Sequence, residues 1–344
     1  MILVLNCGSQ SIKWKVFDQK LKVVKEGKCA VSNQEKFQES LQEELKKIDG
    51  IKIDIIGHRV VHGKDLFKEP IKITDENIKQ LETLNNLAPL HNPFNVLGIK
   101  TCQKIFPNIP QIAIFDTEFF KDLPEIAYTY ALPAEIVKEF GFRKYGFHGI
   151  SHEYVAKKAA KIVKKPFNKL KIITCHLGGG SSITAIKNGK AIDTSMGFTP
   201  MQGLVMMTRA GDMDFGIVLE LVREFGLDKT NEILNKESGV KGICGESEML
   251  EVLKKIKSAD PEQRRRAKLA LDIFVYSIKK YIGSYFAILG GCDLLVFTGS
   301  IGSGNKITRE MVCKNSDILK KTKVLAIETD EELAIAEKVI KVIK

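Results

Sequence analysis

A chain of 344 residues is longer than one hydrophobic core usually grows, so its length predicts two domains. Hydrophobic residues make up 44% of the sequence and charged residues 28%, which is typical of a soluble globular protein. The net charge of +11 comes from 45 lysines spread over predicted helix faces, with only 8 arginines, and this pattern disfavours nucleic-acid binding. No apolar run reaches the roughly 18 residues of a membrane span and no basic leader is visible, so we expect a cytoplasmic protein.

The first half of the chain predicts strands alternating with helices. Residues 2–6 form an apolar run typical of a buried strand, and the turn Gly8-Ser9-Gln10-Ser11 leads into the alternating run 12–18. Further strands are predicted at 53–61 and 111–117. Helices are predicted at 34–48, 74–86, 94–105, 134–140 and near 153–163.

The second half repeats this opening at residues 171–187, where a strand is followed by Gly178-Gly179-Gly180 and another strand. Aligning Ser11-Ile12 with Ser182-Ile183 places Gly8 opposite Gly179, about half a chain away, and this repeat predicts a duplicated fold. Helices are predicted at 215–225, 229–236, 261–289 and 331–342, and strands at 293–298 and 323–327. Strands that alternate with helices indicate an α/β fold.

The glycine-rich turns are candidate phosphate sites. Consecutive glycines expose backbone N–H groups without Cβ atoms to block the approach of an anion, and the neighbouring serines add hydroxyl groups. The same pattern is also typical of a hairpin loop, so the turns alone leave both interpretations open. Neither turn has the spacing of a Walker A loop.

Arg59, Arg209 and Asp116 are candidates for charged chemistry. In a chain that strongly prefers Lys, an Arg among apolar and Gly residues favours bidentate binding of a phosphate or carboxylate. The alternative is an Arg that pairs with a buried carboxylate. Asp116 ends a predicted strand and could hold Mg²⁺, or it could cap a following helix. Together with the turns, these residues are typical of phosphoryl transfer.

The six histidines, at positions 58, 62, 91, 148, 152 and 176, lie in turns or at strand ends. As a set they favour a functional site, although each alone could be structural. Metal binding is the rival explanation, but only His148 and His152 have helical spacing and no zincin glutamate accompanies them. The seven cysteines lie far apart without a C-x-x-C pair, which predicts neither disulfides nor a zinc site.

The segments 6–13, 57–63, 87–93, 115–117, 143–152 and 194–209 resemble those of the acetokinase (acetate kinase) family. This family is part of the superfamily of acetate and sugar kinases, heat-shock chaperones and actin. The resemblance implies a duplicated ribonuclease-H-like, actin-like ATPase fold with an interdomain active-site cleft. It implies an N-terminal domain at 1–149, completed by a helix at 332–344, and a nucleotide-binding domain at 150–331. It further implies a homodimer that transfers a phosphoryl group from ATP to acetate, giving ADP and acetyl phosphate, with Mg²⁺ or Mn²⁺.

The resemblance also implies a role for each matching residue. Arg59 and Arg209 would hold the acyl carboxylate and the transferring phosphoryl group, His148 would stabilise its oxygens, and Asp116 and His91 would orient acetate and Mg²⁺. Asn6 and Glu331 would bind the metal. The substrate methyl group would lie against Val61, Leu90, Phe147 and Pro200. The nucleotide and its phosphates would lie near Ser9, Ser11, Lys13, His176, Gly178, Gly179, Gly180, Gly299, Ser300, Ile301 and Gly302.

Three features depart from the family pattern. Gly179 replaces a family Asn, the adenosine loop reads Gly299-Ser300-Ile301-Gly302-Ser303-Gly304-Asn305, and the chain is shorter between this loop and Val324. A propionate or butyrate kinase is one alternative, and the altered loop adds a pyrophosphate-dependent acetate kinase as another. An actin-like or chaperone-like ATPase without acyl transfer is the alternative from a different class.

Overall fold

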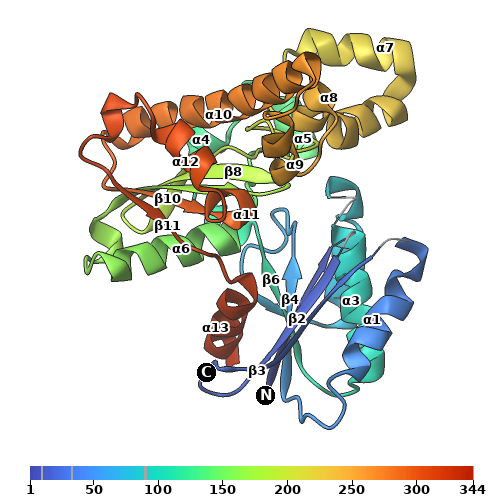
Figure 1. The fold of residues 1–344 in the computed structure, drawn as a ribbon. Helices are drawn as coiled ribbons and strands as arrows, with labels where there is room; N and C mark the ends of the chain where they lie inside the picture. The colour runs from blue at the N-terminus through green and yellow to red at the C-terminus, as the bar shows by residue number, and fades with distance from the viewer. Residues whose placement is uncertain (9–10, 32–33, 89–90, 344) are drawn as a thin grey trace. The chain divides into compact units, whose positions relative to one another are not determined.

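A computed structural model of the chain describes residues 1–8, 11–31, 34–88 and 91–343. It contains two compact units (Figure 1). The first comprises Met1–Lys121, Phe147–Tyr154 and Asp330–Lys344, and the second comprises Asp122–Gly146 and Val155–Thr329. Each unit is built around one β-sheet. Among the described residues, no helix has both the length and the apolar character needed to cross a membrane.

The sheet of the first unit has the strand order β3-β2-β1-β4-β6-β5. Strands β1, β2 and β3 form antiparallel pairs, β4 and β6 continue the sheet parallel to β1, and the short β5 is antiparallel to β6. The strands are β1 (Ile2–Gly8), β2 (Ser11–Phe17), β3 (Val23–Ala30), β4 (Ile55–Val60), β5 (Ile71–Lys72) and β6 (Gln111–Phe115). The parallel strands β1, β4 and β6 therefore end at the same edge of this sheet.

Helices cover both faces of the first sheet (Figure 1). Because successive strand residues point to opposite faces, Leu3 and Leu5 pack with α1 (Phe37–Lys46) and α3 (Asn92–Ile105). Ile2 and Val4 pack on the other face, against α13 (Glu331–Ile343). The short helix α2 (Asp75–Glu82) begins with a capping box formed by Thr74 and Asn77.

The sheet of the second unit has the order β11-β10-β7-β8-β9, so β9-β8-β7-β10-β11 repeats the arrangement β3-β2-β1-β4-β6. This repetition confirms the predicted duplicated ribonuclease-H-like fold. The strands are β7 (Lys171–Leu177), β8 (Ser181–Lys187), β9 (Lys190–Thr194), β10 (Leu294–Thr298) and β11 (Lys323–Ala326). The two turns differ in length, since Gly8 pairs with Ser11 whereas Leu177 pairs with Ser181. Ile12 and Ile183 each belong to the main core of their sheet, which agrees with the alignment of Ser11-Ile12 with Ser182-Ile183.

The longest helix, α10 (Pro261–Leu289), packs against the second sheet through a buried stripe that includes Phe274, Ile278 and Tyr285. Asp260 caps its N-terminus by accepting from the backbone N–H groups of Glu262 and Gln263. The remaining α-helices are α4 (Glu125–Tyr128), α5 (Ala134–Phe140), α6 (Gly149–Ile162), α7 (Phe215–Glu232), α8 (Gly239–Cys244), α9 (Met249–Lys255), α11 (Gly299–Gly302) and α12 (Lys306–Cys313). The first six residues of α6 belong to the first unit.

Most long elements follow the sequence predictions, and the differences concern short elements and element ends. The strands β3, β5 and β9 and the helices α8, α9 and α12 were not predicted, because each is short and weakly periodic. The two helices predicted at 215–225 and 229–236 are joined in α7, which bends at Gly226, and a π-helical segment, Ile233–Glu237, follows. Helix α6 begins at Gly149, four residues earlier than predicted.

Candidate functional site

Polar side chains gather where the parallel strands of the first sheet end. Asn6 lies near the end of β1, Arg59 near the end of β4, and Asp116 directly follows β6. Ligands of open α/β sheets bind at the carboxyl ends of strands, so this edge is the candidate site of the first unit. The sequence predicted these three residues one by one, and the strand pairing brings them together.

Arg59 is the centre of this cluster. Its Nε donates to Asp116 Oδ1 and Oδ2 at 3.2 and 3.1 Å, and its Nη2 donates to Oδ2 at 2.6 Å. Its Nη1 lies 3.0 Å from Glu331 Oε2 and donates to Asn6 Oδ1 at 3.2 Å. The structure therefore shows the alternative predicted for Arg59, in which the guanidinium pairs with buried carboxylates. Asp116 is only 1% exposed and does not cap a helix.

The cluster holds more carboxylates than cations. The Asn6 amide donates to Glu331 Oε2 and Glu332 Oε1, both at 3.2 Å, so three carboxylates lie around one guanidinium. Burial lowers the pKa of Arg59, but the charges of Asp116 and Glu331 outweigh burial and raise it. Burial raises the pKa of Asp116, and Arg59 opposes this while Glu331 adds to it. Surplus negative charge of this kind favours a bound cation.

These oxygen donors fit Mg²⁺ or Mn²⁺. Mg²⁺ is usually held by one or two carboxylates, with waters and substrate phosphates completing its coordination. Asn6 Oδ1 and Glu331 supply such an open donor set, together with Asp116. Within the described residues, no group of three His, Cys, Asp or Glu side chains has the arrangement of a metal site.

His148 is held directly against Asp116. The Asp116 carboxylate accepts the backbone N–H of His148, and the Asp116 carbonyl accepts the N–H of Gly149 at 3.0 Å. A Cβ at position 149 would lie 2.2 Å from this carbonyl, so only glycine permits the approach. His148 itself has φ 58°, in the left-handed region that costs a non-glycine residue energy and that is found most often at functional sites.

Seven other residues of the first unit were predicted to contact substrate or nucleotide: Ser9, Ser11, Lys13, Val61, Leu90, His91 and Phe147. Val61 and Phe147 are buried, and the Phe147 ring meets the edge of the His62 ring at 5.3 Å. His91 directly precedes α3, Ser11 is half-buried, and Lys13 is exposed on β2. The predicted residues Ser9 and Leu90 lie outside the described residues.

Two buried amides of α3 were missed by the sequence analysis. Asn92 exchanges hydrogen bonds with the backbone of His62, both at 3.0 Å. Asn95 accepts the N–H of Val61 at 3.0 Å and donates to the carbonyl of Cys7 at 2.6 Å. These bonds hold the ends of β1 and β4 in place. Two Asn residues on the otherwise apolar face of a helix were the signal that could have revealed them.

The six histidines differ in burial and in their contacts. His58 is buried within β4 and lies 2.6 Å from the Gln111 side-chain oxygen, and burial lowers its pKa to about 4. His62 and His152 are also fully buried, and the His152 ring packs edge-on against Phe120. These three histidines are structural, whereas His91, His148 and His176 lie next to the predicted ligand positions.

In the second unit the two glycine-rich turns lie side by side. They follow β7 and β10, which are parallel neighbours paired from Leu294 and Ile172 to Thr298 and His176. A Cβ built on Gly178 would lie 3.5 Å from Ser300 Oγ. Gly299 has φ 80°, and a Cβ there would meet the Leu177 carbonyl at 2.5 Å, so this close pairing requires glycine.

The hydroxyl of Ser181 is used inside the first of these turns. It accepts the N–H of Gly178 at 3.3 Å and donates to the Gly178 carbonyl at 3.2 Å, and the residue is fully buried. Ser181 therefore does not replace the side chain that Gly179 lacks. Gly179 itself is exposed, and a Cβ there would meet nothing within 4 Å.

Arg209 lies in a loop that contacts this turn. Met207 donates its N–H to the Gly179 carbonyl at 3.3 Å, and Met206 donates to the Arg209 carbonyl at 3.1 Å. The Arg209 guanidinium donates to the carbonyl of Pro200 at 3.2 Å. Within the described part of the chain no carboxylate pairs with Arg209, and burial lowers its pKa. A buried guanidinium whose charge is not balanced by a carboxylate is suited to binding an anion.

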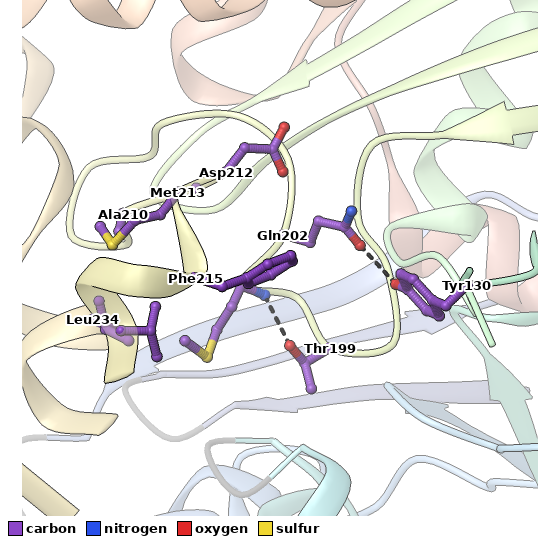
Figure 2. Close-up of a pocket in the computed structure, with 11 residues that line it drawn as sticks. Tyr130, Thr199, Gln202, Ala210, Asp212, Met213, Phe215 and Leu234 are labelled. Carbon is purple, nitrogen blue, oxygen red and sulfur yellow. Dashed lines mark hydrogen bonds between the residues drawn. The ribbon is translucent and has the colours of Figure 1, made fainter. Parts of the chain in front are cut away.

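A cavity of about 440 Å³ lies beside the Arg209 loop (Figure 2). The Tyr130 hydroxyl donates to the Gln202 side-chain oxygen at 2.6 Å across one side of it. Asp212, on the other side, accepts from Gly203 N–H at 2.9 Å and from the Tyr281 hydroxyl at 2.5 Å. These bonds fix the loop on both sides of Arg209. The cavity is lined by Tyr130, Thr199, Met201, Gln202, Ala210, Gly211, Asp212, Met213, Phe215, Val218 and Leu234.

The polar side chains after Gly302 serve the fold. Asn305 caps α12 by accepting from Thr308 N–H at 2.9 Å, and the Ser303 hydroxyl donates to the Gly299 carbonyl at 2.8 Å. Arg309 donates to the carbonyls of Gly302 and Ser303. These side chains form hydrogen bonds within the loop and to α12, so fewer of them are available to bind a nucleoside.

Comparison with known proteins identifies close relatives over the whole chain. The profile of the family described as "Acetokinase family" matches residues 30–342. An acetate kinase from Carboxydothermus hydrogenoformans is 40% identical over 397 aligned positions, which cover 99% of each protein. The crystal structure of Porphyromonas gingivalis acetate kinase is 36% identical, with a TM-score of 0.88 and coverage of 100% of this chain and 99% of that one. A propionate kinase from Francisella tularensis is also 36% identical, with a TM-score of 0.87 and coverage of 98% of both chains.

Proposed function

The chain belongs to the acetokinase family, and from this premise we propose that it is an acetate kinase, which transfers the γ-phosphoryl group of ATP reversibly to acetate. The products are ADP and acetyl phosphate. The observation that carries the proposal is the similarity to acetate kinases along nearly the full length of both proteins. The cluster around Arg59 in the first unit and the loop that holds Arg209 in the second support the residue roles given below.

Phosphoryl transfer is catalysed mainly by positioning and by neutralising charge. The oxygen of acetate would displace ADP directly in line, so no covalent enzyme intermediate is needed. Arg59 and Arg209 would neutralise the charge of the acyl carboxylate and of the transferring phosphoryl group. Asp116 forms a bidentate ion pair with the Arg59 guanidinium and also accepts the backbone N–H of His148. These bonds keep Arg59 and His148 in fixed orientations. The His148 ring would donate to an equatorial phosphoryl oxygen.

Asn6, Glu331 and Asp116 would hold Mg²⁺ or Mn²⁺. When bound, the metal ion would neutralise the negative charge of the nucleotide phosphates. The residues themselves contribute a fixed set of oxygen donors, since the Asn6 amide is oriented by Arg59, Glu331 and Glu332. His91, directly before α3, would help to orient acetate.

The apolar side chains predicted to contact the substrate methyl group favour a short acid. Val61, Phe147 and Pro200 would contact the methyl group, with Leu90 as the fourth predicted contact. An apolar pocket discriminates against one extra methylene group by only about 10- to 200-fold. Propionate is therefore the second candidate substrate, and the similarity to a propionate kinase favours it over butyrate.

The nucleotide would be bound by the glycine-rich turns. Backbone N–H groups at Gly179 and Gly180 and at α11 can donate to phosphates, and no side chain at these glycines obstructs them. The Gly178 N–H is bonded to Ser181 within the turn, so Gly178 would contribute by its lack of a side chain. Ser11, Lys13 and His176 would add side-chain contacts. Because Ser303 and Asn305 serve the fold, adenosine recognition would rely on other groups, and pyrophosphate remains a donor to be tested.

Trapping with hydroxylamine tests this function. The purified protein with Mg²⁺ is given acetate, propionate or butyrate, each with ATP, GTP or pyrophosphate, and the acyl hydroxamate is measured. We expect the fastest product formation with acetate and ATP. If propionate or pyrophosphate gave a faster rate, it would take the place of acetate or ATP in the proposal. Release of phosphate from ATP without any acid-dependent hydroxamate would overturn the kinase function and favour a plain ATPase.

The variant Gly179→Asn tests the phosphate contact that the first turn lacks. Because a Cβ at this position meets nothing within 4 Å, the variant should fold like the parent and leave the melting temperature unchanged. A side-chain donor to a charged phosphate contributes about 1.5–3 kcal/mol, so the KM for ATP should fall about tenfold. Steady-state kinetics check this expectation, with Gly283→Asn on α10 as a control that also has open space. An unchanged KM would mean that the turn already binds phosphate fully.

We also propose that two copies associate. Phe215, Leu219 and Leu227 on α7 are 84%, 70% and 73% exposed, and Ile126 on α4 is 93% exposed. Large exposed apolar side chains of this kind mark interaction surfaces, and homo-oligomers usually bury the same patch of both subunits.

A further inference from the structure

Lys338 of α13 lies between two glutamates from other elements of the first unit. Its Nζ is 2.9 Å from Glu118 Oε2 and 2.8 Å from Glu153 Oε2. The three side chains are 15%, 16% and 18% exposed, so this ion triad is shielded from most of the solvent. Glu118 begins the 3₁₀ turn Glu118–Phe120 after β6, and Glu153 lies in the first turns of α6.

The three elements joined by Lys338 are those that present three of the proposed site residues. Asp116 lies two residues before Glu118, His148 directly precedes α6, and Glu331 is the first residue of α13. Glu331 and Lys338 are seven residues apart, which is close to two helical turns, so they share one face of α13 roughly 10 Å apart. At one end of this face Glu331 pairs with Arg59, and at the other end Lys338 pairs with Glu118 and Glu153.

Apolar side chains pack α13 closely against the first sheet, where Ile335 and Val339 lie against Gly57 of β4. Its contacts with the sheet are made by Ala334, Ile335, Ala336 and Val339, which are aliphatic side chains without directional bonds. Hydrophobic contact is non-directional, whereas an ammonium ion between two carboxylates has a narrow range of favourable positions. The triad therefore adds a second polar anchor for α13, two helical turns from the contacts of Glu331 and Glu332 with Arg59 and Asn6.

The charges of the triad are consistent with this role. Burial lowers the pKa of Lys338, but the charges of Glu153 and Glu118 outweigh burial and raise it. Burial raises the pKa of Glu118, and Lys338 opposes this while Glu153 adds to it. Two carboxylates thus share one cation. Buried ion pairs contribute little net stability compared with apolar replacements, so their value lies in specifying an arrangement.

We propose that Lys338 is a positioning residue for the reaction, which aligns Asp116, His148 and Glu331 by joining the turn after β6, the start of α6 and helix α13. This inference rests on the proposed function, because it assigns those three residues to the catalytic site. Lys338 itself would not touch substrate.

The test compares Lys338→Met with the matched control Lys341→Met, which removes the same charge from an exposed position of the same helix. Lys338→Met should lower kcat about tenfold, because Asp116, His148 and Glu331 would no longer be aligned for the reaction. Lys338→Arg should restore kcat to within about threefold. Lys341→Met should behave like the parent protein.

A neutral triple variant separates positioning from repulsion between the two glutamates. In Glu118→Gln/Glu153→Gln/Lys338→Met no charge is left unpaired, so the melting temperature should return to the parent value. We expect kcat to stay at least about fivefold low, because the directional ion pairs are still missing. Recovery of kcat together with the melting temperature would overturn the proposal, since Lys338 would then serve only to neutralise the glutamates.

Hydrogen exchange gives a readout that does not depend on activity. In Lys338→Met, peptides covering residues 113–120 and 147–154 should exchange at least about tenfold faster, and peptides from the second sheet should be unchanged. Unchanged exchange in both peptides would also overturn the proposal. If the parent protein forms no acyl phosphate, the proposed function fails, and the exchange data still decide whether Lys338 aligns these segments.

Discussion

Replacing Arg59 by Ala is expected to lower kcat about 10³-fold, because the variant loses a fixed cation that neutralises charge in the transition state. It should also destabilise the first unit. Asp116 and Glu331 are 1% and 11% exposed, and the variant removes the guanidinium that pairs with both of these carboxylates, at a cost of about 3–5 kcal/mol. The measurements are hydroxamate formation under saturating substrates and urea unfolding of the same preparation.

Arg59→Lys separates the catalytic effect from the loss of stability. Lysine keeps one positive charge but cannot form the two parallel bonds that Arg59 makes with Asp116. We expect most of the stability to return, while kcat stays about 10²-fold below the parent value. If Arg59→Lys were as active as the parent, the bidentate guanidinium would have no special role in the reaction.

Replacing Arg209 by Ala should lower kcat by a similar factor of about 10³ but without destabilising the protein. Burial disfavours its charge, and among the described residues its guanidinium bonds only to a backbone carbonyl and lies near the Met206 sulfur. Removing a partly buried charge without a counter-ion relieves its desolvation cost. The melting temperature should therefore stay unchanged or rise, and this contrast with Arg59→Ala is the sharpest difference between the two arginines.

A control for this prediction is Arg265→Ala on α10. Arg265 is 65% exposed and pairs with Glu262 at 2.7 Å within the same helix, an ion pair that contributes less than about 1 kcal/mol. Its removal should leave kcat and the melting temperature unchanged. A marked loss of stability in Arg209→Ala would contradict the interpretation of Arg209 as an anion site, because it would show that the guanidinium supports the fold.

The fold was predictable to the extent that its elements have strong local patterns. The long helix α10 has a capping Asp, a first-turn Pro and a C-terminal Gly, and its prediction at 261–289 is confirmed to the residue. The two-residue strand β5 and the edge strand β3 were missed, because β5 is too short to show a pattern and most residues of β3 are exposed. The break predicted between the helices at 215–225 and 229–236 is found at Gly226, whose φ of 74° and ψ of 171° are not helical and interrupt α7.

The candidate site was only partly predictable, because its contacts join residues far apart in the chain. The sequence identified Asn6, Arg59 and Asp116 as polar residues at strand ends but did not reveal that they bond to one another. Asn92 was missed because it lay before the helix predicted at 94–105, and Asn95 because a polar residue in a predicted helix looks like an exposed one. Helix α13 appeared as an ordinary amphipathic helix, and its pairing with Glu118 and Glu153 was invisible.

By itself the sequence determined the alternation of strands and helices, the repeated strand-turn-strand unit and the residue types available for phosphate, carboxylate and metal binding. Each of these depends on local spacing, which the order of residues contains. The tertiary structure decided which charges meet. Among the described residues it paired Arg59 with carboxylates and Arg209 with a backbone carbonyl, it buried His58 and so lowered the pKa of that ring, and it placed Lys338 between two glutamates. Electrostatic interactions depend on distance and burial, and both are set by strand pairing and helix packing between segments that no local pattern connects.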